Sequence, residues 1–168
     1  MDAAMRAAQR LAFRWWAGRC MLDFKVQGAA TLRLLGPEHK ALNPVLAALV
    51  ALARLSLPSD QELAILQLLL NYYEDGSSRV RPHRHPCRQV CASLGAPRTV
   101  EVEGRPIEMV HGDCLLLAGE MHSVPPAKKQ TGPRLSMCLF YATAEDCLQR
   151  SASVLSNGSF WWTHPDDA

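Results

Sequence analysis

The sequence has no hydrophobic run long enough to span a membrane. Its longest apolar stretch, Val45–Ala53, is interrupted at Arg54, whereas a membrane helix needs about 20 apolar residues. We therefore expect no membrane partner. The chain also lacks a strong charge of either sign, because its formal net charge is only +2, too small to indicate a nucleic-acid-binding protein on electrostatic grounds alone. It contains no internal repeat and no low-complexity segment.

The six cysteines form no compact disulfide framework, because they are scattered along the chain as Cys20, Cys87, Cys91, Cys114, Cys138 and Cys147. No secretory signal precedes them, so we expect free thiols in a reducing compartment and an intracellular protein of the nucleus or cytoplasm. An organelle is the alternative. Four arginines stand against one acid in the first twenty residues, although that stretch contains no serine, which transit peptides favour.

The length of 168 residues predicts about one domain, and we divide the chain into residues 1–40, a core at 41–145 and a tail at 146–168. The pattern predicts a helix over residues 5–16, which would lay Leu11, Trp15 and Trp16 on the core. One or two short strands are expected within residues 20–34. A second helix is expected at about 43–56, with Asn43 as its N-cap and Pro44 at its first position.

From about residue 64 the pattern changes to short strands separated by Gly and Pro turns. The predicted strands are Ala64–Tyr73, Gln89–Ala92, Thr99–Glu103, Ile107–Val110, Cys114–Ala118 and Arg134–Ala142. Gly104-Arg105-Pro106 is expected to close a hairpin. As an alternative for the start of the first strand, Ser59 and Glu62 could cap a short helix. The predicted fold class is α+β, mainly β: a sandwich or barrel preceded by helices.

His83 and His85 are the first candidate metal ligands. In a strand, side chains two positions apart point to the same face, so both imidazoles can reach one ion. An exposed pair in an arginine-rich loop is the alternative. His122, which follows the Gly112-Asp113 turn and a buried strand, is the candidate third ligand. The alternative is that His122 lies near the core with its hydrogen bonds made by the protein and binds no metal. The three imidazoles together predict a site for one metal ion.

Arg134 opens an apolar strand in which alternation places Arg134, Ser136, Cys138 and Phe140 on one face and Leu135, Met137, Leu139 and Tyr141 on the other. Both faces are largely apolar, which predicts a buried strand. Its arginine either extends to water or, if it points inward, must meet a carboxylate of the protein or of a ligand. Asn71 and Tyr73 would share one face of another strand. The alternative is a strand-end asparagine and a boundary tyrosine without a functional role. Combined with Arg134, Ser136 and a three-ligand ion, they would describe a site for a metal-chelating dicarboxylate.

These elements, in this order, resemble the AlkB family of iron(II)/2-oxoglutarate-dependent dioxygenases over about residues 64–141. The family pattern N-x-Y-x-D-G followed by H-x-D corresponds to Asn71-Tyr72-Tyr73-Glu74-Asp75-Gly76 and His83-Arg84-His85, and its S-L-G to Ser93-Leu94-Gly95. The family's G-D, distal histidine and R-x-[NS] strand correspond to Gly112-Asp113, His122, and Arg134 with Ser136. The strand pattern and this resemblance predict a double-stranded β-helix (jelly-roll, cupin-like) barrel with N-terminal helices.

The resemblance also implies a chemistry. His83, His85 and His122 would hold Fe(2+), with 2-oxoglutarate and O2 as cosubstrates. Arg134 would pair with the distal carboxylate of 2-oxoglutarate, helped by Tyr73, while Asn71 and Ser136 line the same pocket. The expected reaction is hydroxylation or oxidative demethylation, with alkylated nucleic acid as the substrate class typical of the family. We expect a monomer.

The sequence departs from the family pattern in three places. His85 stands where the family has a carboxylate ligand, Phe140 replaces a second arginine, and the segment Asp113–His122 is shorter than the family loop. An all-histidine triad carries one less negative charge and tunes its metal differently. The family's nucleotide-gripping lid would fall in residues 1–40, where the match is poor, and we expect a degenerate lid there.

Other functions stay open. A cupin-type three-histidine metalloprotein is one, because Gly76, His83, His85 and Gln89, then Gly112, Gly119 and His122, echo the two cupin motifs. Such a protein has no need of Arg134. A binding module on the same barrel, without turnover, is another and is favoured by His85. A zinc site of His83, His85, Cys87 and Cys91 is a third, with awkward geometry for four ligands.

Overall fold

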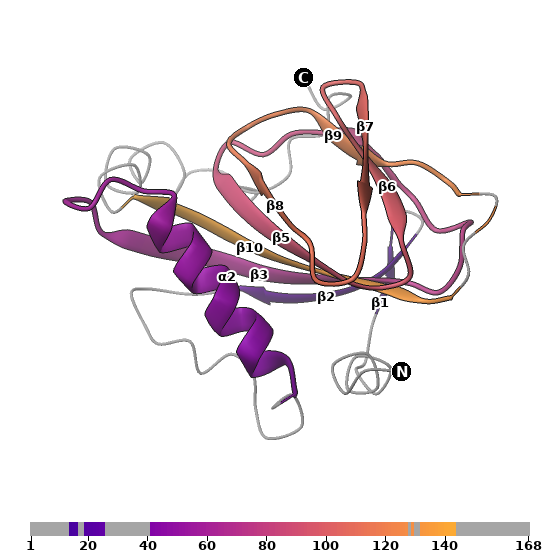
Figure 1. The fold of residues 1–168 in the computed structure, drawn as a ribbon, viewed down its shortest axis with the longest axis horizontal. Helices are drawn as coiled ribbons and strands as arrows, with labels where there is room; N and C mark the ends of the chain where they lie inside the picture. The colour runs from indigo at the N-terminus through magenta and orange to yellow at the C-terminus, as the bar shows by residue number, and fades with distance from the viewer. Residues whose placement is uncertain (1–13, 17–18, 26–40, 128, 130–131, 144–168) are drawn as a thin grey trace.

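The computed structural model describes residues 14–16, 19–25, 41–127, 129 and 132–143, which form two antiparallel sheets and one helix (Figure 1). The larger sheet has the order β1-β2-β3-β10-β5-β8 and the smaller one β4-β9-β6-β7. The strands are β1 (Arg14–Trp16), β2 (Arg19–Lys25), β3 (Leu63–Tyr73), β4 (Val80–His83), β5 (Arg88–Gly95), β6 (Arg98–Val102), β7 (Arg105–Met109), β8 (Cys114–Leu117), β9 (His122–Val124) and β10 (Arg134–Thr143).

The strand order from β3 to β10 is that of a jelly roll. Counted from β3, the larger sheet pairs the first, eighth, third and sixth strands, and the smaller sheet pairs the second, seventh, fourth and fifth. The chain therefore crosses between the sheets in two intertwined passes, and Figure 1 shows the two sheets facing each other across the barrel. This confirms the predicted double-stranded β-helix.

Strand β10 is the centre of the larger sheet, and all ten of its residues are buried. It pairs with β3 on one side and β5 on the other. The predicted alternation is confirmed. Leu135, Met137, Leu139 and Tyr141 face a core under the helix, whereas Arg134, Ser136, Cys138 and Phe140 line a pocket inside the barrel.

Helix α2 (Asn43–Leu55) covers the outer face of the larger sheet and packs on β5 and β10 (Figure 1). Its buried residues Leu46, Leu49 and Ala53 recur at the spacing of one helical face. The predicted helix is confirmed, but the predicted cap is wrong: Leu42 is the N-cap, with no side-chain cap bond, and Asn43 already belongs to the helix. Within the described residues, no helix has the length and hydrophobicity needed to cross a membrane.

The β6–β7 hairpin is confirmed, but its turn lies earlier than predicted. Val102 and Arg105 are register partners, so Glu103 and Gly104 form a two-residue turn, with φ of 48° and 73°. Positive φ at both positions is the geometry that matches the twist of antiparallel strands. Arg105 and Pro106 therefore belong to β7, an edge strand where proline loses no ladder bond.

The first residues differ most from expectation. The predicted helix over residues 5–16 is wrong at its end, because Arg14–Trp16 is strand β1, paired with β2. Residues 5–13 lie outside the described part. The strand expected within residues 20–34 is confirmed as β2, which adds to β3, up to Lys25. The tail at 146–168 also lies outside the described residues, and the three-part division of the chain stays a prediction.

Candidate metal centre and carboxylate pocket

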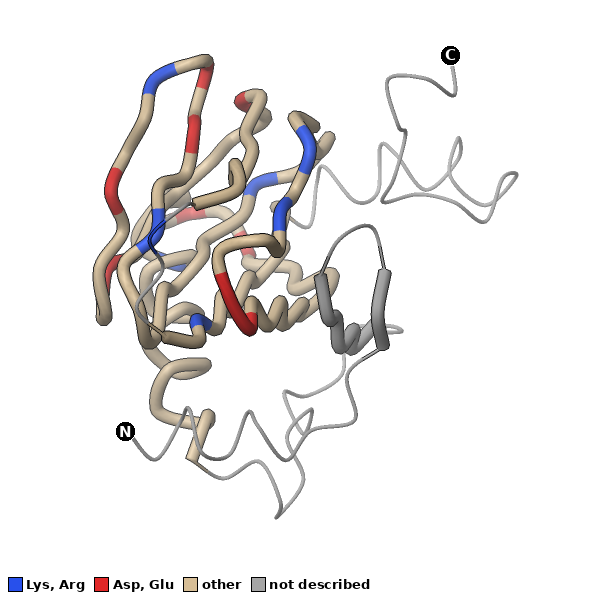
Figure 2. Tube along the Cα trace, turned by 90° about the vertical axis from the view of Figure 1, so that its right-hand side faces the viewer, with Lys and Arg blue, Asp and Glu red and all other residues tan. Residues whose placement is uncertain are grey.

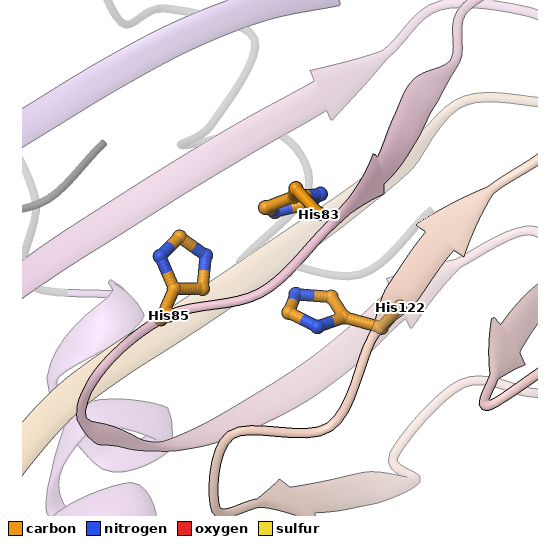
Figure 3. A group of neighbouring side chains, drawn as sticks. All are labelled: His83, His85 and His122. Carbon is orange, nitrogen blue, oxygen red and sulfur yellow. The ribbon is translucent and has the colours of Figure 1, made fainter. Parts of the chain in front are cut away.

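The three predicted histidines come together inside the barrel (Figure 3). His83 is the last residue of β4, and its register partner His122 is the first residue of β9 in the same sheet. One ring nitrogen from each of His83, His85 and His122 lies within 4.8 Å of the others. These residues form the group with metal-ligating geometry in the described part of the chain, and it includes neither Cys87 nor Cys91, so the zinc alternative has no support.

His85 reaches the group from outside a strand. The expectation that His83 and His85 share one strand face is wrong in this detail, because β4 ends at His83. The chain turns inward immediately afterwards, and only 5% of His85 is exposed. Its ring lies edge-on to His83, at 4.9 Å between ring centroids, and edge-on to Phe140, at 4.8 Å. The position is therefore fixed by packing against β10 rather than by strand alternation.

Two of the imidazoles are held in the tautomer that leaves Nε2 able to bind a metal. His83 Nδ1 lies 2.8 Å from the carbonyl oxygen of Arg81, and His122 Nδ1 lies 2.9 Å from that of Glu120. A carbonyl can only accept, so each Nδ1 carries the proton and each Nε2 keeps its lone pair. Burial also lowers the pKa of His122, which keeps the ring neutral.

Gln89 of β5 contacts His122, although it is not among the predicted site residues. Its side-chain Nε2 lies 2.9 Å from Nε2 of His122, so the amide donates to the lone pair of the ring. A metal ion bound at that nitrogen would displace this hydrogen bond. Gln89 is buried and faces the pocket. The sequence did carry a signal, since Gln89 stands at the position after His85 that the cupin-like pattern uses.

The group fits a transition-metal ion by its chemistry and closely by its spacing. Imidazole is a ligand for iron, zinc, copper and nickel. Nitrogens bound at about 2.1 Å to one ion stand about 3–3.5 Å apart, so small rotations of the rings would complete the site. The neighbouring carboxylate of Glu120 lies outside the group and accepts the backbone N–H of Ala118, which lowers its pKa. The ligand set is therefore neutral.

Arg134 lies in the same pocket, and only 2% of it is exposed. Its Nε donates to the hydroxyl of Ser93 at 2.9 Å, and its guanidinium carbon lies 5.0 Å from the centre of the Tyr73 ring. Among the described residues, its Nη1 is buried and has no hydrogen-bond partner. Asn71, Tyr73 and Ser136 line the pocket as predicted. Ser93 was named only as part of a motif; its role follows from its register position opposite Ser136.

The register of the larger sheet sets the order of these side chains. Phe140 and Gln89 are partners at the histidine end, and Arg134 is opposite Gly95 at the other end. Cys138 with Cys91, and Ser136 with Ser93, stand between them. The arginine leans toward the histidines through its bond to Ser93. The pocket therefore has a metal-ligating end and a cationic end, joined by an apolar and thiol floor.

No protein-family model matches the chain, and no curated protein matches it. Its structure is similar to an oxidoreductase of the 2OG-Fe(II) oxygenase family from Burkholderia pseudomallei, with 18% identity over 82% of this chain and 75% of that one and a TM-score of 0.56. Lower similarity is found to a predicted oxalate decarboxylase from Thermotoga maritima (17% identity, 45% of this chain and 65% of that one, TM-score 0.40). An RmlC-like cupin from Shewanella frigidimarina is similar at 15% identity (54% and 91%, TM-score 0.37).

At these identities the likeness concerns the fold, and it agrees with the jelly-roll order of the strands. The chain is thus a double-stranded β-helix protein with a three-histidine group that could hold a metal ion.

Proposed function

We propose that this protein is an iron(II)- and 2-oxoglutarate-dependent oxygenase. His83, His85 and His122 would bind the ion, and Arg134 would bind the far carboxylate of the cosubstrate. The observation that carries the proposal is the guanidinium of Arg134, buried in the same pocket as the histidines and with Nη1 unpartnered among the described residues.

A buried guanidinium without an anion is costly, because its charge is desolvated and a donor goes unused. A carboxylate ligand removes both costs, since the fork of an arginine donates two parallel hydrogen bonds to it. Ser93 fixes the fork from one side and the Tyr73 ring supports it from another. A dicarboxylate that reaches from this fork to the histidines would explain why both ends share one pocket.

The residues of the chain then have separate tasks. Arg134, with Ser93 and Tyr73, would hold the cosubstrate at its far end, and Asn71 and Ser136 would complete the polar lining. The Nδ1 bonds of His83 and His122 place the proton on Nδ1 and would leave both Nε2 atoms able to bind the ion, once Gln89 releases that of His122. Iron(II), 2-oxoglutarate and O2 supply the oxidation of a C–H bond to C–OH, with succinate and carbon dioxide as the other products.

His85 and Phe140, two of the residues at which the chain departs from the family pattern, are in contact, with ring centroids 4.8 Å apart. Relative to the family pattern, the chain has exchanged a carboxylate and an arginine for an imidazole and a phenyl ring. One negative and one positive charge disappear together, so the charge of the site is unchanged. We infer that His85 replaces the carboxylate as a neutral ligand within a pocket adapted to it.

The substrate class proposed from the resemblance is alkylated nucleic acid. Arginines flank the metal-ligating histidines along the chain: Arg79, Arg81 and Arg84 are exposed and Arg88 is half-buried. The β6–β7 hairpin carries the acids Glu101, Glu103 and Glu108, and Figure 2 shows acidic positions recurring along it. The segment that carries His83 and His85 therefore offers local positive charge to a phosphate backbone, although the net charge is small.

The test separates binding from turnover. Protein loaded anaerobically with Fe(II) is titrated with 2-oxoglutarate by calorimetry, and succinate formation is then measured with methylated DNA and RNA oligonucleotides and their unmethylated controls. We expect one equivalent of cosubstrate bound and succinate formation stimulated by a methylated strand. Metal binding without 2-oxoglutarate binding would refute the oxygenase and favour the cupin-type metalloprotein. The contact between Gln89 and His122 is the observation that supports this alternative. Cosubstrate binding without turnover would indicate a binding module.

A further inference from the structure

Two cysteines stand side by side on the floor of the pocket. Cys91 of β5 and Cys138 of β10 are register partners in the larger sheet. Both line the pocket, and both belong to a small apolar cluster that includes Leu69 and Phe140. Neither is in a disulfide. No step of the proposed reaction uses them.

Their geometry is that of a dithiol in contact. Directly opposed residues of antiparallel strands have Cα atoms about 4.5–5.5 Å apart, and a disulfide joins Cα atoms about 4.4–6.8 Å apart. The two side chains point to the same side of the sheet, because both line the pocket. Their thiols are hydrogen-bonded to each other, and this bond raises the pKa of Cys91 well above its ordinary value, as does burial. The hydroxyl of Ser136 lies 3.2 Å from Sγ of Cys138.

We propose that Cys91 and Cys138 form a reversible oxidation site, which a hydroperoxide converts to a cross-strand disulfide. The sulfur of Cys138 attacks one oxygen of hydrogen peroxide, the O–O bond breaks, and the departing hydroxide leaves as water with the thiol proton. The sulfur of Cys91 then displaces the oxygen from the resulting sulfenic acid, which leaves as a second water with the proton of Cys91. The pair loses two electrons and the peroxide gains them.

Three features favour this pair over other cysteines. Both cysteines line the pocket and Cys91 is half-buried, so a molecule as small as hydrogen peroxide has a route through the pocket to Cys138. Ser136 can donate a hydrogen bond to the sulfur that attacks. Cys114, by contrast, is exposed on β8, where its register partner is Ala92 rather than a thiol. Cys114 therefore has no cysteine as its register partner among the described strands, so it lacks the cross-strand geometry of Cys91 and Cys138.

The test is peptide mapping of the full chain, without metal or cosubstrate, so that it does not depend on the proposed function. Reduced protein is treated with hydrogen peroxide, its remaining thiols are alkylated under denaturing conditions, and the chain is digested without reductant. Arg88 separates Cys87 from Cys91 for trypsin, and Glu145 separates Cys138 from Cys147 for a glutamate-specific protease. We expect one linked pair of peptides, Cys91 to Cys138, which disappears on treatment with dithiothreitol.

The variants Cys91→Ser and Cys138→Ser should each abolish the linked pair, and Cys114→Ser should retain it. Because a disulfide limits the unfolded chain, the apparent Tm of oxidised wild type should rise on the order of 5–10 °C under non-reducing conditions. The proposal is overturned if wild type shows no linked pair under conditions that oxidise Cys114. It is equally overturned if Cys138 links to Cys87, its other neighbour in the cluster.

Discussion

The exchange of Arg134 for lysine or methionine tests whether the buried guanidinium serves a ligand or the fold. Lysine keeps the charge but loses the fork and the Nε bond to Ser93. We expect Arg134→Lys to weaken 2-oxoglutarate binding by about an order of magnitude or more. For Arg134→Met, a loss of about 2–5 kcal/mol corresponds to about 30-fold to several thousand-fold in Kd. Metal content should stay near that of wild type in both variants.

The free energy of unfolding of the ligand-free protein should change little in Arg134→Met. The exchange removes a buried donor that has no partner among the described residues, but it leaves the Ser93 hydroxyl unpaired. Each effect is worth about 1–3 kcal/mol with opposite sign, so the net change should not exceed about 2 kcal/mol.

Arg98 provides the matched control, because it is also 2% exposed yet donates to the backbone carbonyls of Asp75, Gly76, Ser78 and Pro125. Arg98→Met should therefore lower the free energy of unfolding by several kcal/mol, because it leaves these backbone carbonyls without their hydrogen-bond donor. Calorimetric titration and thermal melts measure both quantities. If Arg134→Met binds 2-oxoglutarate like wild type and melts as low as Arg98→Met, the guanidinium is structural and the reasoning fails.

Three further changes probe the rest of the site. His122→Ala should lose most of about one equivalent of Fe(II), measured by metal analysis after anaerobic loading, and unchanged content would remove His122 from the site. His85→Asp should raise 2-oxoglutarate decarboxylation by restoring a negative ligand, and addition of Phe140→Arg should raise it further, because the two side chains touch; a fall in both would mean that the pocket is adapted to three histidines. Ser93→Ala should weaken 2-oxoglutarate several-fold, the equivalent of about 1 kcal/mol, without loss of metal, whereas unchanged affinity would dismiss Ser93 as a positioning residue.

The parts of the fold that the sequence predicted are those governed by period-2 alternation. In β10 the apolar and the functional faces separate as expected, because both faces are buried and a shift of one residue would exchange them. Local signals such as helix-capping residues predicted the structure less reliably. Asn43 has the side chain of an N-cap, but the helix begins one residue earlier. The local pattern at Arg14–Trp16 favours a helix, whereas the strand there depends on pairing with β2, which is not a local property.

The site could be predicted only in part, because several of its contacts join segments that are far apart in the sequence. The spacing of His83 and His85 indicates a pair of ligands, but the buried position of His85 depends on packing against Phe140, far along the chain. Gln89 and Ser93 act through contacts with His122 and Arg134 that cross between strands. The sequence gives no sign of the structural role of Arg98, because a residue that binds four carbonyls of other segments carries no motif of its own.

The two ends of the pocket belong to different walls of the barrel. His83 and His122 are on β4 and β9 of the smaller sheet, whereas Arg134 and Ser136 are on β10 of the larger one. A ligand held at both ends therefore spans the gap between the sheets. By thermodynamic linkage, its binding free energy adds to the cost of any opening motion that parts them. Amide hydrogen exchange in β4 and β9 thus reports occupancy of the pocket, and the barrel becomes more rigid only when both ends are filled.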